Sequence, residues 1–191
     1  MDFELVAGNL ALDFTNTIHS YGEADPRDDL RTFADFAGWC RQAGLLQKEE
    51  ERIVLRSAQA VAQRCFRRAL ELRETLYHVF CPIASQGKAS LEALRQLEAH
   101  FRRAMAEVSI QKAGERYEMG WSAVLPLDRV LNEIAGSAMD LLTSERLPRI
   151  RQCAGEKCSW LFLDTSRGGQ RRWCDMQACG NRAKVRRFRR R

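Results

Sequence analysis

Two pairs of cysteines near the end of the chain have the residue type and spacing of a metal site. Four residues separate Cys153 from Cys158, four separate Cys174 from Cys179, and fifteen lie between the pairs. Such spacing lets two turns of the chain close around one tetrahedral ion, and thiolates are preferred ligands of zinc. The sequence therefore predicts that these four cysteines hold a single Zn²⁺ ion.

Four thiolates would fill the coordination shell of that ion, whereas a catalytic zinc keeps one open position. The predicted site is therefore structural. An iron–sulfur cluster is the main alternative for four cysteines, although its ligands generally stand closer together. The remaining cysteines, Cys40, Cys65 and Cys81, lie in apolar helical segments and are expected to be buried thiols.

The residues around the two pairs predict a small fold that the metal organises. An apolar run, Trp160–Leu163, is followed by a loop with Gly168 and Gly169 and by the basic stretch Arg171–Trp173. This order predicts a β-hairpin between the cysteine turns and a helix from about Cys179 onward. The result would be a treble-clef-like finger, which is too small to hold a hydrophobic core without its metal.

Positive charge is concentrated in the same part of the chain. Residues 149–191 contain 13 Lys and Arg residues against 3 acidic ones, whereas acidic residues outnumber basic ones in the rest of the chain. Arginine outnumbers lysine there by 11 to 2, and guanidinium groups match phosphate oxygens well. The segment is therefore predicted to bind nucleic acid, the alternative being a solvated tail that aids solubility.

The predicted nucleic-acid contacts lie on both sides of the second cysteine pair. Arg171 and Arg172 stand beside Cys174, where they could also neutralise the thiolates. In the C-terminal helix, Val185 and Phe188 are expected to pack back on the finger. The basic residues of that helix are Arg182, Lys184, Arg186, Arg187, Arg189 and Arg190. The tryptophans of the finger are expected in its core rather than stacked on bases.

Residues 1–148 are predicted to form a separate α+β domain, mostly helical with a few short antiparallel strands, and residues 149–191 the finger. Predicted helices cover 30–43, 49–80, 91–105 and 127–142. Pro82 and Gly87 are expected to break the second of these helices. Predicted strands cover 2–6, 107–111 and 115–121, the last two as a hairpin.

The rest of the composition bears on where the protein works. No apolar run approaches the roughly 18–20 residues that cross a membrane, and the first residues lack the features of a secretory signal. An odd number of cysteines, seven, also fits poorly with a disulfide framework. The chain is therefore expected to be cytoplasmic, with no membrane partner.

A second motif, GNLALDFTNT, covers Gly8–Thr17. Its polar residues Asn9, Asp13 and Asn16 could line a pocket for an effector. The alternative is that they cap turns and satisfy backbone groups at a junction between strand and helix. The three histidines are scattered, and no nucleophile pairs with a base in the sequence, so no enzymatic activity is expected. An enzyme with an unrecognised site in the helical domain is the alternative.

Residues Cys153–Arg191 closely resemble the CGNR zinc-finger family, which is named after the tetrapeptide found here at 179–182. The motif at Gly8–Thr17 resembles the opening of the ABATE domain, which precedes that finger in many bacterial proteins. The resemblance implies a stress-related bacterial transcriptional regulator whose finger binds duplex DNA.

One finger reads few base pairs, so a homodimer or a partner protein is expected to add specificity. A small-molecule or protein effector would act on the N-terminal domain. Two alternative functions remain open at this point, an RNA-binding protein and a zinc-finger adaptor that binds an acidic protein partner.

Overall fold

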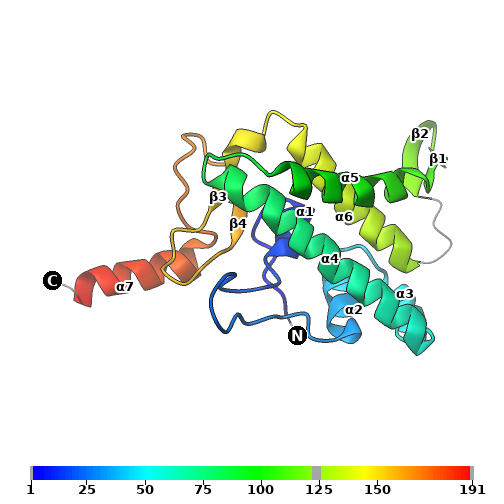
Figure 1. Ribbon diagram of the computed structural model, residues 1–191, viewed down its shortest axis with the longest axis horizontal. Helices are drawn as coiled ribbons and strands as arrows, with labels where there is room; N and C mark the ends of the chain where they lie inside the picture. The colour runs from blue at the N-terminus through cyan, green and yellow to red at the C-terminus, as the bar shows by residue number, and fades with distance from the viewer. Residues whose placement is uncertain (1, 122–125, 190–191) are drawn as a thin grey trace.

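The computed structural model describes residues 2–121 and 126–189 (Figure 1). Its helices are α1 (Leu10–Thr15), α2 (Phe33–Gln42), α3 (Lys48–Val54), α4 (Gln59–Ala84), α5 (Leu91–Met105), α6 (Pro126–Leu142) and α7 (Asn181–Arg189). Its strands are β1 (Val108–Ala113), β2 (Arg116–Trp121), β3 (Ile150–Gln152) and β4 (Leu161–Leu163). β1 pairs with β2 and β3 with β4, both antiparallel, so the predicted α+β class is confirmed. None of the described helices is long and apolar enough to cross a membrane.

The longest helix, α4, runs through the middle of the molecule and contacts α1, α5 and α6 (Figure 1). The short α1 is deeply buried, and Leu12 and Phe14 have no exposed surface. The ring of Phe14 lies 4.9 Å from that of Trp39 on α2. One continuous cluster of buried apolar side chains joins these helices to β3, β4 and the C-terminal cysteines. The C-terminal segment therefore packs against the helices, and the division into 1–148 and 149–191 stays a prediction.

Three predicted helices are confirmed close to their expected bounds, and two of them begin at a polar cap. Thr32 Oγ1 accepts a hydrogen bond from the Asp35 amide at 3.2 Å, and the Asp35 carboxylate accepts one from the Thr32 amide at 2.8 Å. This reciprocal capping box fixes the start of α2. Ser90 Oγ accepts from the Ala93 amide at 3.1 Å and starts α5 in the same manner. The third, α6, starts at Pro126.

The single helix predicted over 49–80 is wrong, because the chain forms two helices there. The amides of Arg56 and Ser57 bond to carbonyls three residues earlier, a tightening that ends α3 before α4 begins. The expected break at Pro82 is also wrong. α4 runs through it to Ala84, since the missing amide donor of a proline in the last turn affects only the helix end.

The strand predicted over residues 2–6 does not form. The Phe3 amide donates instead to Gln42 Oε1 at 2.8 Å, and Gln42 Nε2 donates to the Phe3 carbonyl at 2.6 Å. A side-chain amide on α2 thus takes the place of a neighbouring strand. The hairpin predicted around Gly114 is confirmed as β1–β2, with this glycine at φ 62° in its turn.

The polar residues of the N-terminal motif make internal hydrogen bonds. Asn9 caps α1, because its Oδ1 accepts from the amides of Ala11 and Leu12 at 3.0 and 3.3 Å. The Asn16 side chain bonds to both backbone groups of Leu161 on β4, at 2.8 and 2.9 Å. These contacts agree with the structural alternative for the motif, and an effector pocket at its polar residues stays a prediction.

Asp13 is the charged member of the motif, and it lies half-buried beside the chain that enters α1. Its Oδ1 accepts a hydrogen bond from the Ala7 amide at 2.9 Å. Burial raises the pKa of Asp13 to about 6, and hydrogen bonds from the Ala7 and Val6 amides only partly oppose this rise. Its pKa in the folded chain therefore lies above the ordinary value of 3.8.

We expect Asp13→Asn to change how stability depends on pH. The pKa of Asp13 is higher in the folded chain than in the unfolded chain, so its protonated carboxyl stabilises the fold at low pH. This contribution is lost as the pH rises through the pKa of the folded state. Between about pH 5 and about pH 8 the loss amounts to about 1 kcal/mol. Urea unfolding at both values should show the free energy of the wild type falling relative to that of the variant. If the difference in unfolding free energy between wild type and variant stays constant with pH, the result contradicts a raised pKa for Asp13.

Candidate metal centre and its basic helix

The first cysteine pair lies in the turn of the β3–β4 hairpin. The Cys153 amide donates to the Trp160 carbonyl at 2.8 Å and extends the ladder beyond the paired strands. Cys158 follows in the loop, which we call the knuckle (residues 153–158). The predicted hairpin between the two cysteine pairs is therefore wrong, since the partner of β4 precedes the first pair.

A buried carboxylate explains why the segment after β4 forms a loop. Asp164 is fully buried, and it accepts hydrogen bonds from Ser166 Oγ at 2.6 Å, the Ser166 amide at 2.9 Å and the Arg171 amide at 3.0 Å. Burial alone would raise the pKa of Asp164, but these hydrogen bonds outweigh it, and the pKa is lowered. The ionised carboxylate thus holds residues 164–171 in a closed turn that places the second cysteine pair.

The second pair stands at the start of the C-terminal helix. Asp175 caps a π-helical turn, Met176–Gly180, by accepting a hydrogen bond from the Ala178 amide at 2.5 Å. Cys179 lies within this turn, and the nine-residue α7 follows directly. The helix predicted from about Cys179 onward is therefore confirmed, and its first turn is fixed by a cysteine of the cluster.

The four cysteine sulfurs converge on one point. Each Sγ lies within 4.8 Å of the other three, and three of the four side chains are buried, Cys158 being half-buried. Two of the separations are 3.7 Å (Cys158 to Cys174) and 3.6 Å (Cys174 to Cys179). A tetrahedral zinc ion with Zn–S bonds of about 2.3 Å would separate its ligands by about 3.8 Å. The donor set therefore fits a metal ion of this kind.

The electrostatics of the cluster also call for a cation. Hydrogen bonds from the Cys158 and Cys174 thiols lower the pKa of Cys153 to about 2, whereas the same cluster raises the pKa of Cys174 through its contacts to Cys153 and Cys158. One thiolate is thus stabilised at the expense of its neighbours. A dication would allow all four to ionise together and release their protons. Held by four thiolates, a zinc ion would have no open position for a substrate.

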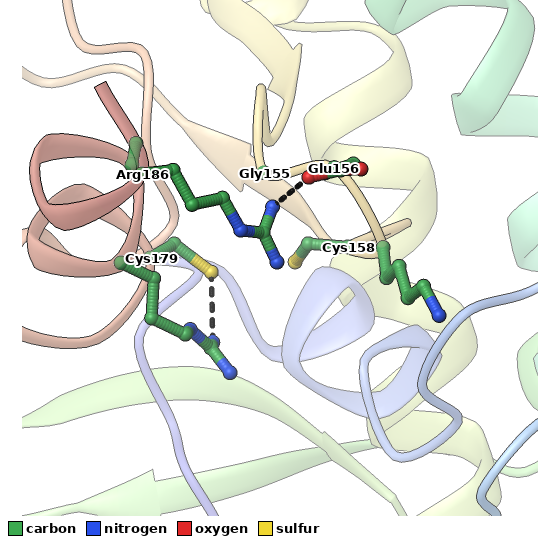
Figure 2. Close-up of a pocket in the computed structure, with 8 residues that line it drawn as sticks. Gly155, Glu156, Cys158, Cys179 and Arg186 are labelled. Atoms are coloured by element: carbon green, nitrogen blue, oxygen red, sulfur yellow. Dashed lines mark hydrogen bonds and ion pairs between the residues drawn. The ribbon is translucent and has the colours of Figure 1, made fainter. Parts of the chain in front are cut away.

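Further donors surround the sulfurs. The Cys174 amide donates to Cys153 Sγ at 3.3 Å, and Arg182 Nη2 donates to Cys179 Sγ at 3.1 Å (Figure 2). The hydrogen bond to Cys179 raises the pKa of Arg182. Such outer contacts orient metal ligands and partly compensate thiolate charge. From the sequence, Arg171 and Arg172 are expected to neutralise the thiolates, but Arg182 makes this contact.

Arg171 and Arg172 do not contact the sulfurs. Arg171 Nε donates to the Trp173 carbonyl at 2.9 Å, and its Nη2 donates to the carbonyls of Val6, at 3.1 Å, and Cys174. The Arg172 guanidinium lies 5.3 Å from the centre of the Trp173 ring. Arg171 is therefore an internal brace between the finger and the N-terminal segment, a role that no local sequence signal reveals.

Gly155 in the knuckle leaves little room for a side chain beside the sulfurs. A Cβ on this residue would lie 3.0 Å from Cys158 Cβ, 3.3 Å from Cys179 Sγ and 3.5 Å from Cys153 Sγ. The glycine therefore allows the knuckle to pack closely against the cluster.

The basic side chains of α7 fall into two groups. Arg182 bonds to a cysteine sulfur, and Arg186 forms an ion pair with Glu156 in the knuckle (Figure 2). Lys184, Arg187 and Arg189 are exposed, and they make no ion pair or hydrogen bond with any residue of 2–121 or 126–189. Arg190, also predicted as a nucleic-acid contact, lies outside the described residues.

The apolar residues of α7 do not pack back on the finger, so that expectation is wrong. Val185 is 50% exposed and Phe188 is 82% exposed. α7 points away from the rest of the molecule beyond its first turns (Figure 1), which leaves no surface for them to cover. Trp160, in contrast, is buried, and its Nε1 donates to the Ile18 carbonyl at 3.2 Å. Trp173 is half-buried.

Two protein-family models match the chain, in the order that its motifs predict. The ABATE model, described as "Putative stress-induced transcription regulator", matches residues 8–145, and the CGNR zinc-finger model matches residues 149–191. Neither description is that of an enzyme. A search of curated proteins found no match.

We expect the purified chain to contain one zinc ion, and Cys158→Ser to lose it. Serine keeps the size of the side chain but is a poor zinc ligand, so the variant should lose its zinc on dialysis against a chelator that leaves the wild type loaded. Cys81→Ser is a matched control, because Cys81 is also half-buried but lies outside the cluster. Elemental analysis of both variants gives the metal content. Equal zinc in both, or iron in the wild type, would contradict the assignment.

Proposed function

Because the chain belongs to the ABATE family and ends in a CGNR zinc finger, we propose that it is a transcription regulator that binds duplex DNA through this finger. The family description supports regulation, and the surface of α7 supports DNA as the target. In this proposal the metal has a structural role, and the protein is not an enzyme.

The observation that carries the proposal is the group of three unpaired cations on α7. Lys184, Arg187 and Arg189 are exposed and lack an acidic partner among the described residues. The buried Arg73, in contrast, is paired with Asp28 at 2.6 Å. Lys184 and Arg187, three residues apart on one helix, repel each other, so they favour a polyanion as their partner.

The way in which α7 is held also supports this function. Its first turn continues from Cys179, and Arg182 is bonded to that cysteine's sulfur. A basic helix of nine residues is marginal in isolation, so its order would depend on the metal cluster. The protein would thus present cations on a rigid support whenever zinc is bound, as a helix that contacts DNA requires.

RNA is the second candidate, and one observation favours it. Phe188 is exposed between Arg187 and Arg189, where its ring could stack on an unpaired base. Competition between duplex DNA, single-stranded RNA and structured RNA for the zinc-loaded chain separates the two targets. Preference for duplex DNA supports the proposal, and preference for RNA replaces DNA as the target.

We expect replacement of Lys184, Arg187 and Arg189 by alanine to weaken DNA binding and to flatten its salt dependence. Each lost phosphate contact lowers the slope of log K against log salt by about 0.9, so the triple variant should lose about 2.7. A matched control replaces Arg64, Arg67 and Arg95, exposed arginines on α4 and α5. Fluorescence anisotropy at several salt concentrations gives both slopes. Equal slopes for the two triple variants would contradict binding through α7.

The dependence on metal is a separate expectation. Cys174→Ser combined with Cys179→Ser removes two ligands at the base of α7 without changing any basic residue. If the metal orders the helix, this variant should bind DNA more weakly than the wild type in the same titration. Equal binding would mean that the basic residues act as an unstructured polycation, and the search for a target would move to protein partners.

A further inference from the structure

A small hollow lies between the knuckle and the first turns of α7 (Figure 2). Its volume is about 70 Å³. A water molecule needs roughly 10–15 Å³ by the same measure, so the hollow has room for about five non-hydrogen atoms. A phosphate group has this number of atoms.

The walls of the hollow carry positive charge. Lys157 of the knuckle and Arg182 and Arg186 of α7 all line it, and Glu156 is the single carboxylate among its lining residues. Cys158 and Cys179 of the cluster line it as well, and a bound dication, together with the hydrogen bond from Arg182 to the Cys179 sulfur, would offset their thiolate charge. Gly155 and Ala183 line it without long side chains, which leaves the space open. A guanidinium has five N–H donors, so Arg182 keeps several after its bond to the Cys179 sulfur. The hollow is therefore built for a small anion with several acceptor oxygens.

An internal anion already sits at the edge of this hollow. The Glu156 carboxylate faces Arg186 and forms an ion pair with its guanidinium (Figure 2). The two side chains are 56% and 46% exposed, and ion pairs at such exposure are weak. An anion that binds Arg186 more tightly than Glu156 does can therefore displace the carboxylate. Without such an anion, Glu156 keeps Arg186 turned toward the hollow.

We propose that this hollow binds one phosphate group, with Lys157, Arg182 and Arg186 as its donors and Glu156 as a displaceable internal competitor. The proposal rests on the proposed function, because a backbone phosphate of nucleic acid is the intended source of this group. Bound there, the phosphate would lie against the metal-organised start of α7, and Arg189, on the same flank of the helix as Arg182 and Arg186, would lie farther along the same backbone. Nothing in the sequence singled out Glu156 and Lys157, because only the fold of the knuckle brings them beside α7.

Glu156→Gln is the direct test, made in the zinc-loaded full chain. It removes the competing charge and keeps the shape, so affinity for duplex DNA at low salt should rise several-fold. The matched control is Glu98→Gln. Glu98 pairs with Arg102 on α5 and is 54% exposed, close to the value for Glu156, but it lies outside the finger. Lys157→Ala should weaken binding and reduce the salt slope by about 1.

The outcomes separate this inference from the proposed function. If the wild type binds DNA but Glu156→Gln and Glu98→Gln behave alike, DNA binding stands and the phosphate site is overturned. If no variant binds DNA, the proposed function fails, and the site is then decided by inorganic phosphate as the probe. A rise in melting temperature with phosphate over chloride, larger in Glu156→Gln than in Glu98→Gln, would support a site for the free anion. No such difference would overturn it.

Discussion

Convergence of four cysteine sulfurs to within 4.8 Å of one another is the constraint on which the rest of the C-terminal structure depends. Four thiolates at this distance repel strongly unless a cation lies between them. The knuckle, the turn organised by Asp164 and the π-helical turn before α7 each bring one or two sulfurs to the same point. The cluster in turn fixes the position of α7, because Cys179 lies in the π-helical turn directly before that helix.

A second set of contacts ties this finger to the helices. Asn16 on the C-terminal side of α1 bonds to both backbone groups of Leu161, and the Leu163 amide donates to the Ala7 carbonyl at 2.8 Å. Arg171 reaches from the finger to the Val6 carbonyl. Polar contacts of this kind satisfy backbone groups that would otherwise be buried without partners, so they specify one docked arrangement. The N-terminal motif therefore has a clear structural purpose in holding the finger.

The sequence predicted the parts of this structure that depend on local pattern. Cysteine spacing identified the cluster, and caps at Thr32 and Ser90 located the helix starts, because both signals act over a few residues. It failed where a distant residue decides the outcome. Residues 2–6 do not form the predicted strand, because the Gln42 side chain bonds to the backbone of Phe3, and β4 pairs with the strand before the first cysteine pair.

The assignment of arginine roles failed for the same reason. Arg171 stands next to a cysteine in the chain but bonds to backbone carbonyls, whereas Arg182, three residues beyond another cysteine, reaches a sulfur because the helical turn brings it back. Spacing along a helix therefore indicated thiolate contact better than adjacency in sequence. The exposed Phe188 was also unpredictable from its apolar character, since its exposure depends on α7 pointing away from the body of the molecule.

The common core of helices and finger has a consequence for how such chains can evolve. Leu161, Phe162 and Leu163 of the finger are buried in the same apolar cluster as the side chains of α1. A finger exchanged between relatives would need to carry matching residues at this interface, or it would leave cavities and unpaired amides on both sides. Recombination near residue 148 should therefore be tolerated poorly, and the segments on either side should be inherited together. If α7 binds DNA as proposed, new targets would then arise by substitution of its exposed residues, where few other contacts resist change.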